Sequence, residues 1–202
     1  MLISTYMKSG ISYIIIILGL ISSCSRNDGI YREYYGNGVL FEEGKLLNGK
    51  KEGLWLRWYE DGSKLSEINY NSGKMHGEAK TWYKNGSLKS VCVYKDGLVS
   101  GEVINYHSNG NLHYKRRYDE NGKTQGDFRL FFENGALSQK GELENGLMIG
   151  EWELFYENGK LKHKQKYEGG KKNGEGIFFD MNGDTVKLEY YQNGTLVRTV
   201  QK

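Results

Sequence analysis

The chain has 202 residues, of which 38% are hydrophobic, and its formal net charge is +3. It contains 28 glycines and 16 tyrosines but no proline. The hydrophobic content excludes a disordered chain, and the nearly balanced charge excludes a dedicated nucleic-acid-binding protein. Frequent glycines between aromatic segments are typical of β-strands joined by tight turns.

Residues 1–23 are predicted to be a lipoprotein signal peptide. One charge, Lys8, precedes an apolar run at 11–21, which has the length of a signal-peptide core and is too short to span a bilayer. The run ends in the sequence ISSC, which resembles the lipobox at which bacterial lipoproteins are cleaved and acylated. The resemblance implies that Cys24 becomes the acylated first residue, with 24–29 as a tether. A signal peptide that happens to end near a cysteine is the alternative.

A lipid on Cys24 would attach the protein to a membrane of the bacterial cell envelope, and we expect the outer membrane rather than the inner one. Of the two cysteines, only Cys92 would then remain, and we interpret it as a small buried hydrophobic residue. Removal of the signal peptide deletes Lys8 and lowers the net charge by one.

An Asn-Gly or Asp-Gly pair recurs at steps of 24 or 25 residues along the rest of the chain. The glycines of these predicted turns are Gly38, Gly62, Gly86, Gly110, Gly135, Gly159 and Gly183. Two further series, starting at Gly49 and Gly53, keep the same period. Asn-Gly between alternating segments is a strong hairpin signal, and a constant period indicates tandem repeats. We predict seven repeats over 30–198, followed by a tail at 199–202.

The predicted fold is all-β, an open single-layer twisted antiparallel meander of about seven hairpins. If Asn158-Gly159 is a two-residue turn, Phe155 lies opposite Lys162, Glu153 opposite Lys164, and Glu151 opposite Lys166. One face is then a solvated ladder of glutamates and lysines rather than an anion-binding site. The other face would carry Tyr156, Leu161, Leu154, Trp152 and Tyr167.

The repeat resembles the short variant of the MORN-repeat family, with the pattern YxNGxL…Y..G…G. Two copies are Tyr83, Asn85, Gly86, Leu88, Tyr94, Gly97 and Gly101, and Tyr156, Asn158, Gly159, Leu161, Tyr167, Gly170 and Gly174. The resemblance implies a hairpin-repeat scaffold that binds partners. Because some members are YwqK-type antitoxins, it also implies a role as an antitoxin or immunity protein.

No catalytic, cofactor or metal site is predicted. No Gly-rich phosphate loop precedes a helix, and no nucleophile has an evident base and orienting group. His107 and His113 flank one turn, but the hairpin pairing predicts opposite faces, which excludes a shared metal. The loop that starts at Asp180 resembles a calcium loop only weakly, because Gly183 stands at its fourth position instead of its sixth.

Repeat four is the predicted partner-binding site, through Asn105, His107, Tyr114 and Arg116 on the apolar face. At the position of Arg116 other repeats have Ile68, Cys92, Gly141 and Gln165. Local departures from a protein's own pattern are favoured places for function, and Arg and Tyr are enriched at binding hot spots. Neutral drift in a central repeat is the alternative.

The sequence therefore favours a non-enzymatic, monomeric, lipid-anchored scaffold that binds a protein, with a toxin as one version of that partner. Two alternatives remain open at this point. The first is binding of carbohydrate or cell wall by exposed aromatic side chains such as Trp58 and Trp82. The second is a purely structural spacer.

Overall fold

The computed structural model describes residues 28–202, so the predicted signal peptide and Cys24 lie outside the described residues. The described part of the chain forms strands and turns without a helix. It accordingly contains no helix with the length and apolar character needed to cross a membrane.

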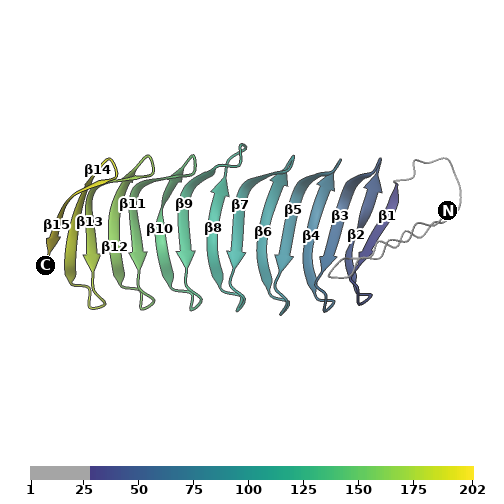
Figure 1. The fold of residues 1–202 in the computed structure, drawn as a ribbon, viewed down its shortest axis with the longest axis horizontal. Helices are drawn as coiled ribbons and strands as arrows, with labels where there is room; N and C mark the ends of the chain where they lie inside the picture. The colour runs from purple at the N-terminus through teal and green to yellow at the C-terminus, as the bar shows by residue number, and fades with distance from the viewer. Residues whose placement is uncertain (1–27) are drawn as a thin grey trace, which may run out of the picture. The chain divides into compact units, whose positions relative to one another are not determined.

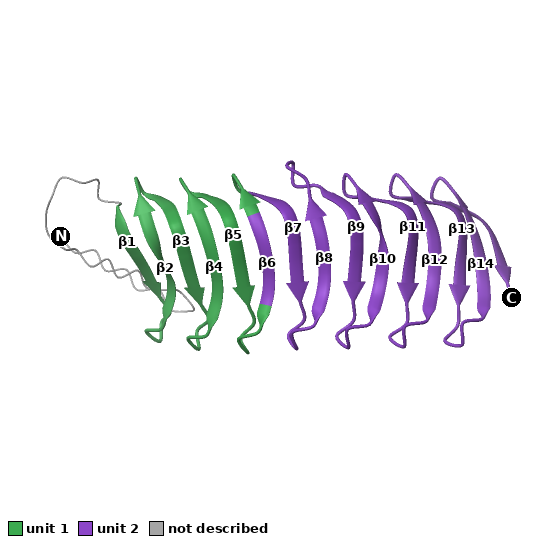
Figure 2. Ribbon diagram, turned by 180° about the vertical axis from the view of Figure 1, so that it is seen from behind, with its two compact units in different colours: residues 1–88, 94–97 green, residues 89–93, 98–202 purple. Residues whose placement is uncertain are grey.

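Fifteen antiparallel strands follow one another in a single sheet in chain order, which confirms the predicted fold class. They divide into two compact units, coloured separately in Figure 2. Unit 1 ends at Leu88 and also includes Tyr94–Gly97. Its strands are β1 (Gly29–Tyr34), β2 (Leu40–Leu47), β3 (Lys50–Trp58), β4 (Lys64–Asn71) and β5 (Lys74–Trp82).

Unit 2 consists of Lys89–Val93 and Leu98–Lys202, so strand β6 (Leu88–Lys95) has residues in both units. Its other strands are labelled in Figure 1: β7 (Leu98–Tyr106), β8 (Leu112–Tyr118), β9 (Thr124–Phe131), β10 (Leu137–Glu144), β11 (Leu147–Phe155), β12 (Leu161–Glu168), β13 (Lys171–Phe179), β14 (Thr185–Gln192) and β15 (Thr195–Gln201). Repeats four, five, six and seven correspond to the hairpins β7–β8, β9–β10, β11–β12 and β13–β14. Strand β15 includes residues 199–201, which the sequence had suggested to be a tail.

The Asn-Gly turns are three-residue loops, not the predicted two-residue turns. In repeat six the Tyr156 carbonyl accepts from the Gly159 amide at 2.9 Å, and the Tyr156 amide donates to the Lys160 carbonyl at 2.8 Å. Only Gly159 has positive φ, 81°, while Asn158 does not. The Asn158 side chain instead accepts from the Lys160 amide at 3.0 Å. This is a turn followed by a glycine bulge, with the asparagine fixing the loop by its own hydrogen bond.

The two-residue turns lie at the other end of the hairpins, in the series that starts at Gly49. Leu47 pairs directly with Lys50, and the two residues between them both have positive φ, 52° at Asn48 and 70° at Gly49. That conformation is the one whose twist matches a hairpin. Repeat four is one residue longer than the other repeats. Its extra residue lies at this end and produces a three-residue loop, in which the Asp119 amide donates to the Lys123 carbonyl and the Asp119 carbonyl accepts from the Gly122 amide.

The bulge at each three-residue loop shifts the strand register by one residue. In repeat six Glu151 is opposite Lys166 and Glu153 opposite Lys164, as predicted, but Phe155 is opposite Leu161. The expectations that Phe155 faces Lys162 and that Leu161 shares the apolar face are therefore wrong. A one-residue shift moves side chains to the other face of a sheet.

One position per repeat, two residues after each closing glycine, forms a buried row. Trp55 and Ala79 occupy it in unit 1, and Val103, Phe128 and Trp152 occupy it in unit 2. We call the side of each unit that carries this row the packed face and the other side the charged face. Trp152 covers Gly141 so closely that a Cβ there would overlap its ring, and Trp55 covers Gly44 in the same way. Cys92, one of the residues predicted to be buried, is half-buried.

At several of the three-residue loops a tyrosine joins one repeat to the next. In unit 1 the hydroxyls of Tyr35 and Tyr59 donate to the carbonyls of Trp58 and Trp82, at 2.8 and 2.9 Å. In unit 2 the Tyr156 hydroxyl donates to the Phe179 carbonyl at 2.8 Å. These hydrogen bonds satisfy backbone carbonyls at the strand ends, which explains why a tyrosine recurs at this loop position.

Candidate functional site

Repeat four brings its four predicted site residues together on the packed face. Asn105 is directly opposite Tyr114, and Val103 is directly opposite Arg116. The side chains of Asn105, His107, Tyr114 and Arg116 are all half-buried. They therefore form one partly accessible surface and could contact a partner together.

Arg116 lies between two aromatic rings. Its Cζ is 4.9 Å from the centre of the Tyr114 ring and 4.8 Å from that of Phe128. Its Nε is buried and makes no hydrogen bond, and no carboxylate of residues 28–202 forms an ion pair with it. Stacking of this kind stabilises a guanidinium while leaving its donors unused. Arg116 is thus held in place without being neutralised.

His107 replaces the loop tyrosine of other repeats and makes the equivalent contact. Its Nε2 lies 2.9 Å from the Phe131 carbonyl, where a tyrosine hydroxyl would donate. The sequence did not reveal this role because His and Tyr share little beyond a polar atom at the end of a ring. His107 therefore supports the hairpin loop as well as the surface.

The predicted separation of His107 and His113 is wrong. Their ring centroids are 4.2 Å apart, because the loop bulge places His113 on the same side as His107. Burial, followed by the electrostatic effects of His107 and then of Arg116, lowers the pKa of His113. Within residues 28–202 no three His, Cys, Asp or Glu side chains are grouped so that they could hold a metal ion.

The Asp180 loop uses its carboxylate internally. Oδ1 of Asp180 accepts from the amides of Asn182, Gly183 and Asp184 at 2.8, 2.9 and 3.0 Å. These backbone hydrogen bonds, that of Asp184 above all, lower the pKa of Asp180. The carboxylate closes the turn where other repeats use a ring residue.

An aromatic row that sequence reasoning did not connect to Arg116 continues from it along the packed face of unit 2. The rings of Phe128 and Trp152 are 5.4 Å apart, and those of Trp152 and Tyr167 are 6.4 Å apart. The recurrence of a large residue two positions after the closing glycine was the available signal. The row gives repeat four a rigid neighbour on one side.

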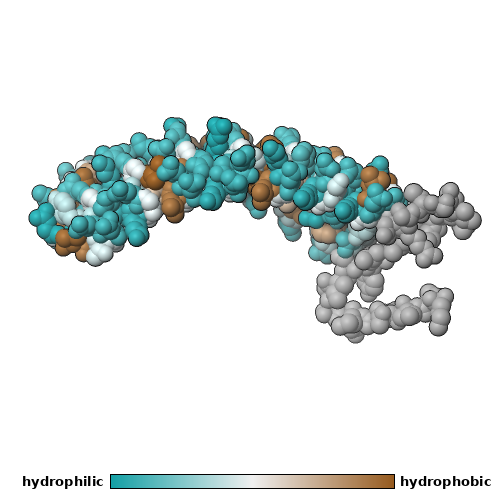
Figure 3. Space-filling model, turned by 90° about the horizontal axis from the view of Figure 1, so that it is seen from above, coloured by the Kyte–Doolittle hydropathy of each residue, from teal (hydrophilic) through white to brown (hydrophobic). Residues whose placement is uncertain are grey.

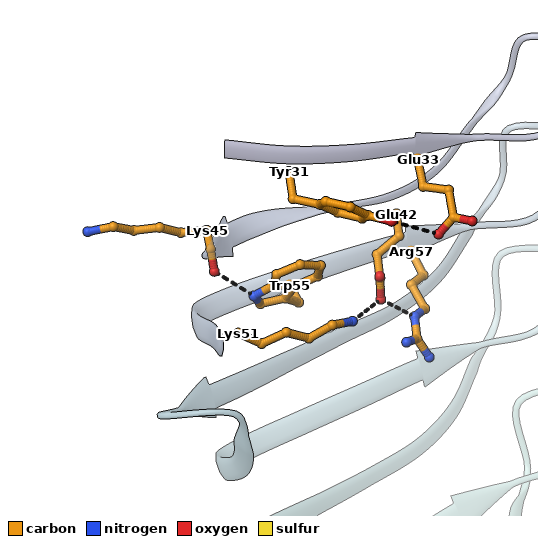
Figure 4. A network of polar contacts seen from close by, with 7 residues as sticks. All are labelled: Tyr31, Glu33, Glu42, Lys45, Lys51, Trp55 and Arg57. Carbon is orange, nitrogen blue, oxygen red and sulfur yellow. Dashed lines mark hydrogen bonds and ion pairs between the residues drawn. The ribbon is translucent and has the colours of Figure 1, made fainter. Parts of the chain in front are cut away.

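A buried carboxylate organises the packed face of unit 1, drawn in Figure 4. Glu42 is 5% exposed, and its Oε1 lies 2.5 Å from Nζ of Lys51 and 2.6 Å from Nε of Arg57. Nζ of Lys51 also lies 3.9 Å from the centre of the Trp55 ring. Lys51 and Arg57 both pair with the Glu42 carboxylate, so these charges are compensated within the unit. We interpret the network as structural.

A second buried polar cluster lies between repeats six and seven. The His163 ring stacks on Phe178 at 4.1 Å, and Gln165 is fully buried. His163 Nε2 and Gln165 Oε1 have no hydrogen-bond partner, and both lie beside Gly176, where a Cβ would meet Gln165. Burial, then the positive charge of Lys172, lowers the pKa of His163.

The charged face of repeat six agrees with the predicted ladder. Nζ of Lys164 is 2.8 Å from Glu151, and Nζ of Lys140 is 2.8 Å from Glu153. The two tryptophans considered for glycan binding, Trp58 and Trp82, are half-buried on the charged face of unit 1. Glycan binding by these rings stays a prediction from the sequence.

Comparison with protein families matches the MORN repeat variant model to residues 27–48, 51–72, 75–96, 100–119 and 148–168, together more than half of the chain. The chain belongs to the MORN repeat variant family. Hairpins β9–β10 and β13–β14 are outside the matched residues, although they have the loops and strand pairing of the MORN repeats around them. A search of curated proteins gave no match.

Proposed function

We propose that this MORN-repeat protein is a non-enzymatic scaffold of the bacterial cell envelope, anchored by a lipid on Cys24, which binds a partner protein through the packed face of repeat four. The observation that carries the proposal is Arg116, a stacked guanidinium without a carboxylate, beside Tyr114 on a half-buried surface. The repeat family supports a scaffold role.

The physical support is preorganisation. Arginine and tyrosine contribute most to binding when they are already held in their bound positions, because less side-chain freedom is then lost on association. The Tyr114 and Phe128 rings fix the Arg116 plane, and Asn105 stands directly opposite Tyr114. A partner carboxylate over this surface would receive charge-assisted hydrogen bonds from Arg116.

The finer role that we propose is that of an antitoxin or immunity protein, whose partner is an exported toxin. It rests on the resemblance to antitoxin-type members of the family and on the lipobox at Cys24. A lipid-anchored scaffold would meet such a toxin at the membrane surface.

The test compares two double variants of the full chain in binding to the partner purified from envelope extract. Tyr114→Ala with Arg116→Ala should weaken binding by at least about 2 kcal/mol, with little change in the melting profile. The matched control is Tyr190→Ala with Arg198→Ala, because Arg198 lies 4.2 Å over the Tyr190 ring in the same unit, on the charged face. Unchanged affinity in the first variant, or an equal loss in the control, contradicts a site at repeat four.

A further inference from the structure

A groove of about 470 Å³ crosses the charged face of unit 2 over β7, β8 and β9. Leu112 and Phe131 line its apolar end. The rest of it is lined mainly by charged side chains, among them Lys115, Arg117 and Arg129. The groove thus combines cations with an apolar wall. Arg116 also lines it, whereas the stacking rings Tyr114 and Phe128 do not. Figure 3 shows, from one side, that hydrophobic residues form small separate groups among hydrophilic ones.

Two of these cations have no acidic partner. Lys115 forms an ion pair with Glu102 at 2.7 Å. Arg117 and Arg129 are exposed, and no carboxylate of residues 28–202 lies within ion-pair distance of either. Asp127 also lines the groove and likewise forms no ion pair within the described chain. Repeat six differs, because its ladder lysine Lys164 has a glutamate partner.

The cations also lie directly beside one another. Arg129 pairs across the strands with Lys115 on one side and with Lys140 on the other. Like charges directly opposite each other in a sheet are destabilising. Glutamates neutralise both neighbours of Arg129 but not Arg129 itself. A bound anion would remove this unfavourable arrangement.

The spacing of the two arginines fits an extended peptide. Arg117 is two residues along β8 from Lys115, the residue that pairs with Arg129, so the two arginines are diagonal neighbours, although a register shift makes Gln125 the direct partner of Arg117. Such neighbours are separated by about 7–8 Å, close to the distance of about 6.6 Å between alternate side chains of an extended segment. Carboxylates two residues apart could therefore each face one guanidinium, in the geometry that arginine recognises best.

We infer that this groove binds an extended acidic segment of a protein, with two carboxylates at alternate positions on Arg117 and Arg129 and an apolar side chain against Phe131 and Leu112. A nucleic acid or an anionic membrane fits less well, because Glu102 and Asp127 line the same groove and would repel a continuous polyanion. The inference goes beyond the proposed function, because it concerns the charged face and its two carboxylate contacts are with Arg117 and Arg129, although Arg116 also lines the groove.

The experiment is a fluorescence anisotropy titration of the full chain with a labelled peptide of sequence Leu-Thr-Glu-Thr-Glu-Thr-Leu. We expect saturable binding that weakens as salt rises, and at least about tenfold weaker binding by Arg117→Ser with Arg129→Ser. The matched control, Lys164→Ser with Lys166→Ser, removes the same charge from the charged face of repeat six and should change affinity by less than about twofold. The variant R117E with R129E should prefer a peptide with lysines in place of the glutamates.

Several outcomes would overturn the inference. They are no binding by the wild-type chain, equal binding of a glutamine version of the peptide, or equal loss in the repeat-six control. Tighter binding of a single-stranded oligonucleotide or of phosphatidylglycerol vesicles would assign the groove to those ligands instead. Tyr114→Ala, at a residue that does not line the groove, should leave peptide binding intact while weakening partner binding, so failure of the proposed packed-face site is distinguishable from failure of this one.

Discussion

Two histidines of unit 2 lie in surroundings that disfavour their charged form. Burial is the main cause of the lowered pKa at both His163 and His113, with Lys172 near the first and His107 and Arg116 near the second. The unfolded chain, with histidine near its ordinary pKa of 6.5, then binds more protons than the folded chain at acidic pH. The free energy of unfolding that the neutral histidines contribute is therefore fully present above pH 6.5. It is lost as the pH falls from 6.5 through the lower pKa of the folded state.

We therefore expect the urea midpoint of unit 2 to fall between pH 7.5 and pH 5. His163→Gln removes the more buried of the two groups and should flatten this dependence, although the carboxylate Glu189 and the cation Lys187 remain nearby. Equal slopes for the wild-type and His163→Gln chains would show that His163 does not supply this linkage.

At the scale of the hairpin, the glycine loops and the strand pairing depend on different constraints. Gly159 has open space around it but a φ of 81°, so a β-branched residue would be strained by the backbone alone. Gly159→Val should cost about 1–3 kcal/mol in local stability. Hydrogen exchange should then accelerate in repeats six and seven and change little in repeats one to three, because repeat stability couples mainly to nearest neighbours. Uniform acceleration across the chain would contradict this.

Gly141 has the opposite constraint. Its backbone φ is ordinary, but a Cβ would overlap the Trp152 ring. Gly141→Ala should therefore cost about 1–3 kcal/mol through displacement of that ring, measurable as a shift in the urea midpoint and in tryptophan fluorescence. Gly36 is the control, because it has neither positive φ nor a neighbour within 4 Å, so Gly36→Ala should be nearly neutral. An equal loss at both positions would argue against the ring contact.

Sequence periodicity predicted the hairpins and the pairing of Glu151 with Lys166 and of Glu153 with Lys164, because these depend on strand alternation and a fixed repeat length. It did not predict the loop bulges, since Asn-Gly occurs in both two-residue and three-residue loops, and the backbone φ of Asn158 decides between them. The bulge in turn determines which face His113 and Leu161 occupy. The sequence did not predict that Arg117 and Arg129 lack an acidic partner, because this depends on the side chains of neighbouring strands.

For the molecule as a whole, the lipid anchor is predicted at Cys24, which lies outside the described residues. Three acyl chains on Cys24 would give stable membrane attachment, since two lipid signals already suffice. Cys24→Ala should leave an uncleaved or soluble protein, detected by membrane fractionation and by the mass of the N-terminal peptide. A cleaved, unlipidated variant that still fractionates with membranes would contradict the lipobox assignment.

We propose that repeat four contacts a protein partner through its packed face. The most direct measurement is site-specific photocrosslinking in intact cells, with a photoreactive residue at Asn105, opposite Tyr114, or at Tyr191, the control on the same face in repeat seven. We predict one discrete protein adduct from position 105 that disappears when Arg116→Ala is added, and none from position 191. Absence of an adduct at 105, or the same adduct from both positions, would contradict the assignment of the binding site to repeat four.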